Sequence, residues 1–257
     1  MVQATDPAIR RIEVLGVPVD SLDMTAATGA VRVMLSRDSG RSNVILSVNP
    51  EKVIVAQKQP NLLSILRDAD LLVPDGIGVV MAAQILGLAT MRRVPGAELM
   101  PEICKLAVET SSRVFLYGAK PDVVTRTAII LRARYPGLQI VGTQDGYLPD
   151  TQMDALIGRI NALRTDVLFV ALGSPRQEQW INRYRDRLRV RVCQGVGGTF
   201  NAICGNPRRA PQSFQRLNLE WFYRLVTQPQ RAHRQAALPK FAAKVLFHAM
   251  SRRRIDA

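Results

Sequence analysis

The stretch VLFVALGSPRQEQWI, residues 167–181, contains the pattern that decides the fold. Its first six residues, 167–172, are all apolar, which favours a strand buried on both faces of a parallel sheet. A helical pattern follows over residues 175–188. Between the two, Ser174 and Gln177 have the spacing of a capping box, with Pro175 at the first helical position. The stretch therefore predicts a strand, a tight turn and a helix in direct succession.

Strand and helix patterns alternate along the rest of the chain in the same way. A helix over residues 121–135 is expected to stop before the Pro136-Gly137 pair, and another is expected over 151–163. The other expected strands cover residues 12–17, 44–48, 71–73, 114–117, 139–141 and 190–193. This alternation predicts an α/β fold with a Rossmann-like, doubly wound and mostly parallel sheet.

Size and composition are those of a globular protein with a substantial core. The chain has 257 residues, of which 47% are hydrophobic and 22% are charged. Its N-terminus lacks a signal-peptide pattern and no run of 18 apolar residues occurs, so we expect a cytoplasmic protein without a transmembrane helix. Cys104, Cys193 and Cys204 lie in apolar surroundings without a CxxC motif, which predicts buried, reduced thiols.

Basic charge is concentrated at the C-terminal end. Residues 206–257 contain 11 Lys or Arg and two acidic residues, a net +9 of the total +14. We expect an α/β domain over residues 1–205 and a basic helical appendage over 206–257. Such charge predicts a polyanionic partner, which is an anionic membrane surface, a phosphate-bearing substrate or nucleic acid.

The appendage contains two amphipathic helical patterns. Apolar residues recur at helical spacing at Phe214, Leu217, Trp221 and Leu225, and again at Leu238, Phe241, Val245 and Ala249. In the second pattern Lys240, Lys244, His248 and Arg252 line another face. A basic face opposite an apolar one suits a helix at the surface of an anionic membrane. The alternative is a helix that packs its apolar face on the domain. Nucleic acid is less favoured, because the aromatic residues follow helical spacing and not exposed stacking positions.

Five strand exits carry glycine or proline together with polar residues. They cover residues 47–51, 74–78, 118–121, 173–178 and 195–199. Ligands of open α/β sheets gather beyond the carboxyl ends of the strands. A tight turn explains each exit alone, whereas five together indicate a site.

Asp75 is the candidate general base at this edge. It follows the strand at 71–73, and a carboxylate there could take the proton from an acceptor hydroxyl. The alternative is a turn residue or helix cap. The helix start at Ser174–Gln177 also suits a diphosphate, because free amides and the helix dipole both favour anions.

Other motifs restrict the choice of chemistry. The loop 195–198 lacks the third glycine of a dinucleotide fingerprint, which disfavours a nicotinamide cofactor. Asp68-Ala69-Asp70 matches the DxD metal-binding motif but precedes a strand. We therefore expect a helix-to-strand turn at the edge of the sheet opposite the candidate site. We expect no metal site and no cofactor. Charge on a departing diphosphate would then be met by cations and amides. Arg92 and Arg93 are candidate cations.

The sequence resembles the WecG/TagA/CpsF family of bacterial glycosyltransferases. The resemblance covers nearly the whole chain. Its motifs are SVNPEK at 47–52, PDGIGVV at 74–80, RVPGAEL at 93–99, VFLYGAKP at 114–121, LFVALGSPRQEQWI at 168–181, GVGGTF at 195–200, RRAP at 208–211 and LEWFYRL at 219–225.

The resemblance implies an inverting, metal-independent enzyme. It would transfer a hexose-type sugar, of the N-acetylmannosamine or glucose class, from a UDP-sugar to an undecaprenyl-diphosphate-linked saccharide in cell-surface polysaccharide synthesis. Such an enzyme would work peripherally at the inner face of the plasma membrane. It would have no nucleic-acid partner, and the resemblance is compatible with an oligomer. The rival hypotheses are a basic nucleic-acid-binding protein and a non-catalytic membrane scaffold.

The resemblance also assigns roles to residues. Asp75 stands at the position of the family's proposed base, with Ser47, which replaces a usual threonine, Arg93 and Gln177 as further catalytic candidates. The implied donor-binding residues are Asn49, Gly76, Gly118, Gly173, Gly197 and Gly198. The implied contacts of the acceptor diphosphate are Arg224, Arg231 and Arg234.

Overall fold

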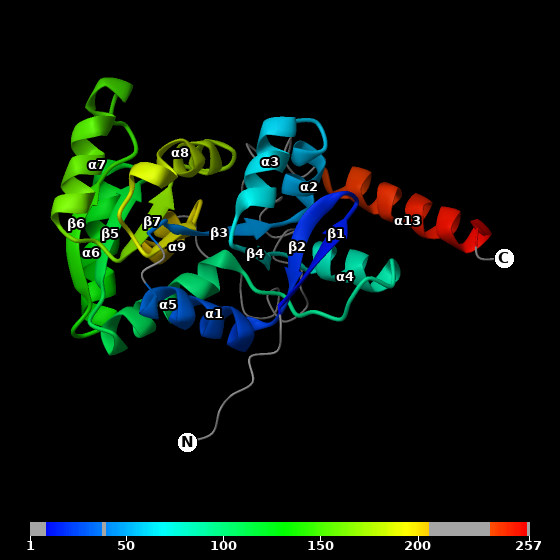
Figure 1. The fold of residues 1–257 in the computed structure, drawn as a ribbon, viewed down its shortest axis with the longest axis horizontal. Helices are drawn as coiled ribbons and strands as arrows, with labels where there is room; N and C mark the ends of the chain where they lie inside the picture. The colour runs from blue at the N-terminus through cyan, green and yellow to red at the C-terminus, as the bar shows by residue number, and fades with distance from the viewer. Residues whose placement is uncertain (1–8, 38–39, 206–236, 256–257) are drawn as a thin grey trace, which may run out of the picture.

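A six-stranded, entirely parallel sheet forms the centre of the molecule (Figure 1). The computed structural model describes residues 9–37, 40–205 and 237–255. The strand order is β4-β3-β8-β7-β5-β6. The strands are β3 (Asn43–Val48), β4 (Leu71–Pro74), β5 (Arg113–Gly118), β6 (Gln139–Gln144), β7 (Val167–Ala171) and β8 (Val192–Gly195). The predicted doubly wound α/β fold is confirmed.

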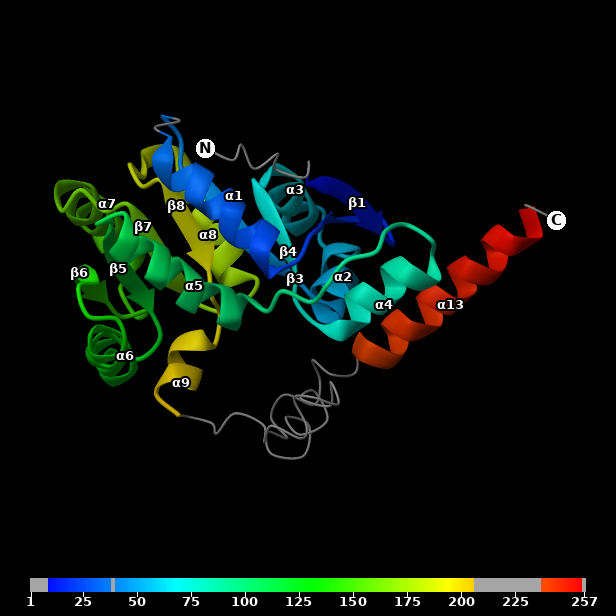
Figure 2. The same cartoon turned by 90° about the horizontal axis from the view of Figure 1, so that it is seen from below.

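Helices cover both faces of this sheet, and each face has its own apolar core. Figure 2 shows α1 and α5 running together across one face. That face carries α1 (Met24–Ser36), α5 (Gly96–Glu109), α6 (Pro121–Arg134) and α9 (Thr199–Ile203). The other face carries α2 (Pro50–Ala56), α3 (Pro60–Asp68), α4 (Ile77–Ile85), α7 (Met153–Ala162) and α8 (Arg176–Tyr184).

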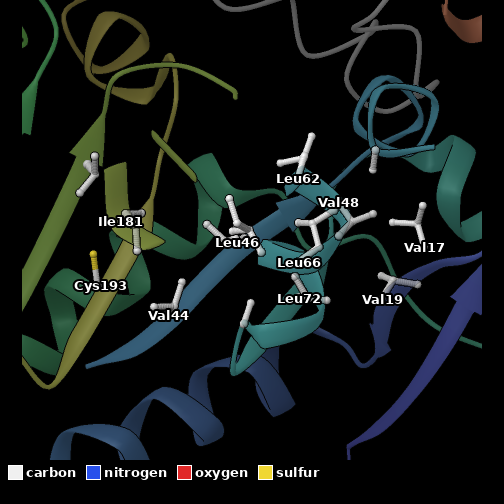
Figure 3. Packing of buried hydrophobic residues seen from close by; sticks show 14 of the residues in the cluster. Val17, Val19, Val44, Leu46, Val48, Leu62, Leu66, Leu72, Ile181 and Cys193 are labelled. Carbon is white, nitrogen blue, oxygen red and sulfur yellow. The ribbon is translucent and has the colours of Figure 1, made fainter. Parts of the chain in front are cut away.

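Strand β3 shows how sequence periodicity divides the two cores. Val44, Leu46 and Val48 belong to the core under α2 and α3, whereas Ile45 belongs to the core on the α1 side. Successive side chains of a strand point to opposite faces, so a continuous apolar run supplies both. Figure 3 shows Leu46 and Val48 of β3 close to Leu66 of α3.

The expected strand over 12–17 is wrong, because the chain turns in its middle. Residues Leu15 and Gly16 have positive φ angles of 53° and 80°. A two-residue turn with both φ angles positive joins antiparallel strands with the twist of a hairpin. The apolar run therefore spans the turn of a separate two-stranded sheet, made of β1 (Arg10–Val14) and β2 (Val17–Ser21).

This hairpin lies beside the edge strand β4. The Asp20 carboxylate accepts a hydrogen bond of 2.7 Å from the backbone N–H of Leu72 and pairs with Arg11 at 2.8 Å. An unpaired edge strand exposes backbone groups to unwanted pairing. A buried carboxylate thus occupies part of the edge that a seventh strand would otherwise cover.

The remaining predicted elements agree with the structure in kind and differ at their ends. The helix expected over 121–135 is α6, which ends at Arg134. The helix expected over 151–163 begins with the short 3-10 turn η1 (Asp150–Gln152) and continues as α7. The helix expected over 175–188 is α8 followed by η2 (Arg185–Arg187). The strand expected over 190–193 is β8, shifted toward the carboxyl edge of the sheet.

The last described element is α13 (Ala237–Ile255), which packs against α2 and α4 and extends beyond the body (Figures 1 and 2). Phe241 and Val245 are 4% and 3% exposed and belong to the core. The second amphipathic pattern thus packs on the domain, which was the alternative to a membrane face. The first pattern, from Phe214 to Leu225, lies outside the described residues.

A different apolar strip of α13 is exposed. Leu246, Phe247 and Met250 are 55%, 70% and 60% exposed. Met81 and Ile85 on the adjacent α4 are also exposed, at 50% and 48%. Within the described ranges, no helix is both long and apolar enough to cross a membrane.

Candidate active site

Asp75 lies where the carboxyl ends of β3 and β4 meet. Its backbone N–H donates a hydrogen bond of 2.8 Å to the carbonyl of Val48, which continues the pairing of β4 with β3 by one residue. The carbonyl of Pro74 accepts a 2.8 Å bond from the N–H of Val94. These two bonds bring the segment before α5 over the end of β4, beside the Asp75 carboxylate.

Gly96 fits between the side chains of Ser47 and Asp75. A Cβ atom added to Gly96 would overlap Ser47 Oγ and would lie 3.8 Å from Asp75 Oδ2. Three segments that are distant in sequence therefore place a hydroxyl, a carboxylate and a bare backbone at one point. Of the expected catalytic residues, Ser47 and Asp75 are brought together here. Gly96 was quoted only as part of the RVPGAEL motif, and its steric role could not be read from the sequence.

The turn after β4 requires glycine. Gly76 has a φ angle of 110°, which side chains of L-residues rarely adopt, and it is the N-cap residue of α4. The capping position that was the alternative for Asp75 thus belongs to Gly76. A Cβ atom on Gly76 would lie 3.9 Å from the Cβ of Asn49, so these two expected donor-binding residues are neighbours.

Asn49 also begins α2. Its Oδ1 accepts a 2.8 Å hydrogen bond from the backbone N–H of Lys52, and Pro50 occupies the first helical turn. This is an ordinary N-cap, since a short polar side chain satisfies one of the free amides of a helix start. Asn49 thus has a structural role as a helix cap, in addition to the donor-binding role that the resemblance implies.

The predicted capping box at Ser174 and Gln177 is wrong. The N-cap residue of α8 is Pro175, whose side chain makes no capping hydrogen bond. Gln177 instead turns toward the exit of β8, where its Oε1 accepts a 2.9 Å bond from the N–H of Gly197. The side chain is 4% exposed, and its Nε2 donates to Glu178 Oε1 at 3.2 Å. A tertiary partner has replaced the local one.

A buried ion pair joins α2 and α8 behind these residues. Lys52 Nζ lies 2.6 Å from Glu178 Oε1, and the two residues are 5% and 0% exposed. Burial opposes ionisation of Glu178, but the charge of Lys52 and the hydrogen bonds that Glu178 accepts outweigh it. The pKa of Glu178 therefore lies below its ordinary value of 4.5. Sequence reasoning missed this pair; the one available signal is a lysine followed directly by the apolar residues 53–56.

Gly118 and Gly173 lie at the exits of β5 and β7. Gly118 has a φ angle of 116°, and a Cβ atom there would lie 2.5 Å from the carbonyl oxygen of Ala171 on the neighbouring strand. This close approach excludes any side chain at Gly118. Four strand spacings of ~4.8 Å separate β5 from β4, so Gly118 and Asp75 are about 19 Å apart along the edge.

Described residues line a cavity at each edge of the sheet. One of about 660 Å³ lies at its amino-terminal edge, where Arg11, Asn43 and Asp70 are among the lining residues. A smaller one of about 210 Å³ lies near the exits of β5, β6 and β7 and is lined in part by Tyr117 and Trp180. The larger cavity is at the opposite edge from Asp75. We place the candidate site at the carboxyl edge, because ligands of open α/β sheets bind there and the polar strand exits lie along it.

The chain matches a family model described as "Glycosyl transferase WecG/TagA/CpsF family" over residues 12–255. It belongs to this family.

Curated relatives cover most of the chain. A Bacillus subtilis protein is 40% identical over 204 residues, which are 79% of this chain and 78% of the relative. A Bacillus spizizenii protein is 38% identical over 211 residues, 82% and 81% of the two chains. A Staphylococcus aureus protein is 33% identical over 235 residues, 91% and 92% of the two chains. All three are named N-acetylglucosaminyldiphosphoundecaprenol N-acetyl-beta-D-mannosaminyltransferase.

In this member of the WecG/TagA/CpsF family, the structure describes only some of the arginines that were expected to bind phosphate groups. Arg93 lies in the segment before α5 and pairs with Glu98 at 3.5 Å, whereas Arg92 is exposed. Arg224, Arg231 and Arg234, expected to contact the acceptor diphosphate, lie outside the described residues. Gly198, the last of the expected donor-binding glycines, is exposed beside Gly197.

The DxD match is a helix-to-strand turn, as predicted. Asp68 ends α3, and Asp70 accepts from the N–H of Val44 at 2.7 Å before β4 begins. Arg185 pairs with both aspartates at the amino-terminal edge of the sheet. Over the described ranges, no three His, Cys, Asp or Glu side chains are grouped as metal ligands would be.

The three cysteines are free thiols, as predicted. Cys104 and Cys193 are buried, and burial raises the pKa of each to about 12. Cys204 is only partly buried, so the expectation of burial is wrong for this cysteine. A thiol with so high a pKa is a poor nucleophile, because the thiolate is the reactive form.

Proposed function

We propose that this protein transfers N-acetylmannosamine from a UDP-sugar to an N-acetylglucosamine that is linked to undecaprenyl diphosphate. The names of the relatives support this acceptor and this sugar, at 33% to 40% identity over most of the chain. The observation that carries the proposal is the convergence of Ser47, Asp75 and Gly96 at the carboxyl edge of the sheet, in a chain of this glycosyltransferase family.

In the proposed reaction Asp75 acts as the general base. Its carboxylate takes the proton of the acceptor hydroxyl as the hydroxyl oxygen attacks the anomeric carbon of the donor. The bond from that carbon to the diphosphate breaks, the new glycosidic bond forms with inversion, and UDP leaves with the electron pair. Ser47 lies beside this carboxylate, where its hydroxyl can donate to a sugar oxygen.

The departing diphosphate is stabilised by cations and amides in this proposal, without a metal ion. Arg93, in the segment before α5, is a candidate for this task, and Arg224, Arg231 and Arg234 are assigned to the acceptor diphosphate. A guanidinium suits this task, because its planar fork binds two phosphate oxygens at once. The donor would extend along the strand exits from Asp75 toward Gly197, Gly173 and Gly118.

A lipid-linked acceptor requires access to a membrane surface. The exposed apolar side chains of Leu246, Phe247 and Met250 on α13, in a C-terminal segment of net charge +9, support peripheral attachment to an anionic bilayer. UDP-sugars are made in the cytoplasm, which places the proposed reaction at the inner face of the plasma membrane.

The test is a transfer assay with defined substrates. UDP-N-acetylmannosamine and UDP-glucose are offered in parallel with a synthetic prenyl-diphosphate-linked N-acetylglucosamine, with and without EDTA, and the product mass is measured. We expect addition of one N-acetylhexosamine at the same rate in EDTA. No product from either donor, under conditions in which a relative from Bacillus subtilis is active, would overturn the proposal. Product only from UDP-glucose would overturn the sugar assignment alone.

A further inference from the structure

The exits of β3, β8 and β7 are joined by a continuous chain of buried polar groups. These three strands are neighbours in the sheet, with β8 in the middle. Lys52 belongs to α2, which follows β3, and Gln177 and Glu178 belong to the first turn of α8, which follows β7. The two helices therefore meet over the exit of β8, where Gly197 lies.

The donors and acceptors in this row of buried polar groups can be arranged in only one order. An ionised carboxylate only accepts hydrogen bonds, so Glu178 Oε1 takes one from Lys52 Nζ at 2.6 Å and one from Gln177 Nε2 at 3.2 Å. The carboxamide of Gln177 can then present only its oxygen to the far side. That oxygen accepts the N–H of Gly197 at 2.9 Å.

The geometry around Gln177 leaves little freedom for a different arrangement. A Cβ atom added to Gly195 would come within 2.9 Å of Gln177 Nε2, so the amide lies directly on the β8 backbone. Lys52, Gln177 and Glu178 are all at least nine-tenths buried. A flipped carboxamide would direct an N–H group at the N–H of Gly197 and an oxygen at the Glu178 carboxylate, which are two repulsive contacts.

We propose that Glu178, whose buried charge Lys52 neutralises, is a positioning residue, which orients the Gln177 carboxamide and thereby sets the Gly197 turn that receives the donor. This inference rests on the proposed function for the role of the turn, but not for the hydrogen bonds. Gln177 acts through Gly197 in this arrangement. Lys52 contributes at a second point, because its backbone N–H holds the Asn49 side chain at 2.8 Å.

Two double variants isolate the acceptor at residue 178. Lys52→Met/Glu178→Gln and Lys52→Met/Glu178→Leu both remove the buried charges and keep similar volumes. Only the first keeps an oxygen that can accept the Gln177 N–H. One hydrogen bond is worth up to about tenfold in affinity.

The first readout is hydrogen exchange at the Gly197 amide, which needs no substrate. We expect protection of this amide to fall about tenfold in the Leu variant and to stay within about threefold of the wild type in the Gln variant. The second readout is the dissociation constant of UDP by calorimetry, with the same expected pattern. Equal Gly197 protection in the two double variants would overturn the positioning role, whether protection is kept or lost in both.

A single variant covers the case in which neither double variant folds. Gln177→Leu keeps the Lys52–Glu178 pair and removes the acceptor of Gly197, so Gly197 protection should fall about tenfold. Unchanged protection there would overturn the inference. If wild-type protein does not bind UDP, the proposed donor is wrong, and the exchange data still decide the positioning role.

Discussion

Gly96 lies directly against the hydroxyl of Ser47, with the Asp75 carboxylate on the same side. Its position is restrained, because the side-chain amide of Gln194 donates a 3.3 Å hydrogen bond to its carbonyl. Gly96 also begins α5 and is buried. A residue at this position therefore controls how closely the segment before α5 approaches the candidate base.

The variant Gly96→Ala should lose both stability and activity. The added methyl group overlaps Ser47 Oγ, and overpacking of this kind costs about 1–3 kcal/mol. Ser47→Ala/Gly96→Ala removes the overlapping oxygen and should recover the free energy of unfolding, measured with urea, but not the transfer rate. Gly29→Ala in α1 is the matched control, since no heavy atom in the described ranges lies within 4 Å of its added Cβ. Equal stability of Gly96→Ala and wild type would contradict the overlap.

The variant Asp75→Asn should lower product formation by at least about a hundredfold, because a neutral amide cannot take the proton of the acceptor. UDP affinity should stay within about threefold of the wild type, since the substitution is isosteric. Both are measured on the same preparation, by product mass and by calorimetry. Asp122→Asn, an exposed aspartate in the first turn of α6, is the control and should keep full activity. Full activity of Asp75→Asn would remove this residue from the mechanism.

The Lys52–Glu178 pair should make the protein acid-sensitive in a defined pH range. The pKa of Glu178 is lowered in the folded state, so the pair stabilises the protein above the ordinary value of 4.5 and loses this contribution as the pH falls through the lower, folded pKa. Urea unfolding between pH 7 and pH 3 measures it. The wild-type curve should fall more steeply below pH 4.5 than that of Lys52→Met/Glu178→Gln. Parallel curves would show that the pair does not titrate with unfolding.

Loss of Lys52 alone should be more harmful than loss of the whole pair. Lys52→Met leaves the Glu178 charge buried without its partner, which costs about 3–5 kcal/mol in comparable cases. The double variant Lys52→Met/Glu178→Gln should be more stable than this single variant at pH 7. The same urea titrations provide the comparison, and the reverse order would contradict the assignment of an ionised pair.

The exposed strip of α13 should mediate attachment to anionic bilayers. Leu246→Ser/Phe247→Ser removes two side chains that are 55% and 70% exposed, and flotation with vesicles rich in phosphatidylglycerol should fall about tenfold or more. Ile129→Ser on α6, with a side chain that is 61% exposed, is the control and should float like the wild type. Equal flotation of all three proteins would show that the strip is not part of the attachment.

The sequence was sufficient for the fold class, and it predicted the carboxyl edge of the sheet as the place of the candidate site. Continuous apolar runs such as 167–172 alternate with helical patterns, and this periodicity is a local property that survives without tertiary context. It also correctly placed Asp75 at a strand exit. It correctly assigned the DxD match to the opposite, amino-terminal edge of the sheet. It failed at 12–17, because an apolar run has the same appearance whether it continues or turns at Leu15 and Gly16.

Only the tertiary structure decided which partner each polar side chain chose. The spacing of Ser174 and Gln177 predicted a local cap, but Gln177 bonds to Gly197, twenty residues later in sequence and adjacent in space. Lys52 and Glu178 are 126 residues apart, and Gly96 meets Ser47 across the sheet edge. Periodicity reports which face of an element is buried. Pairing within the buried layer depends on the order of the strands, which no local pattern contains.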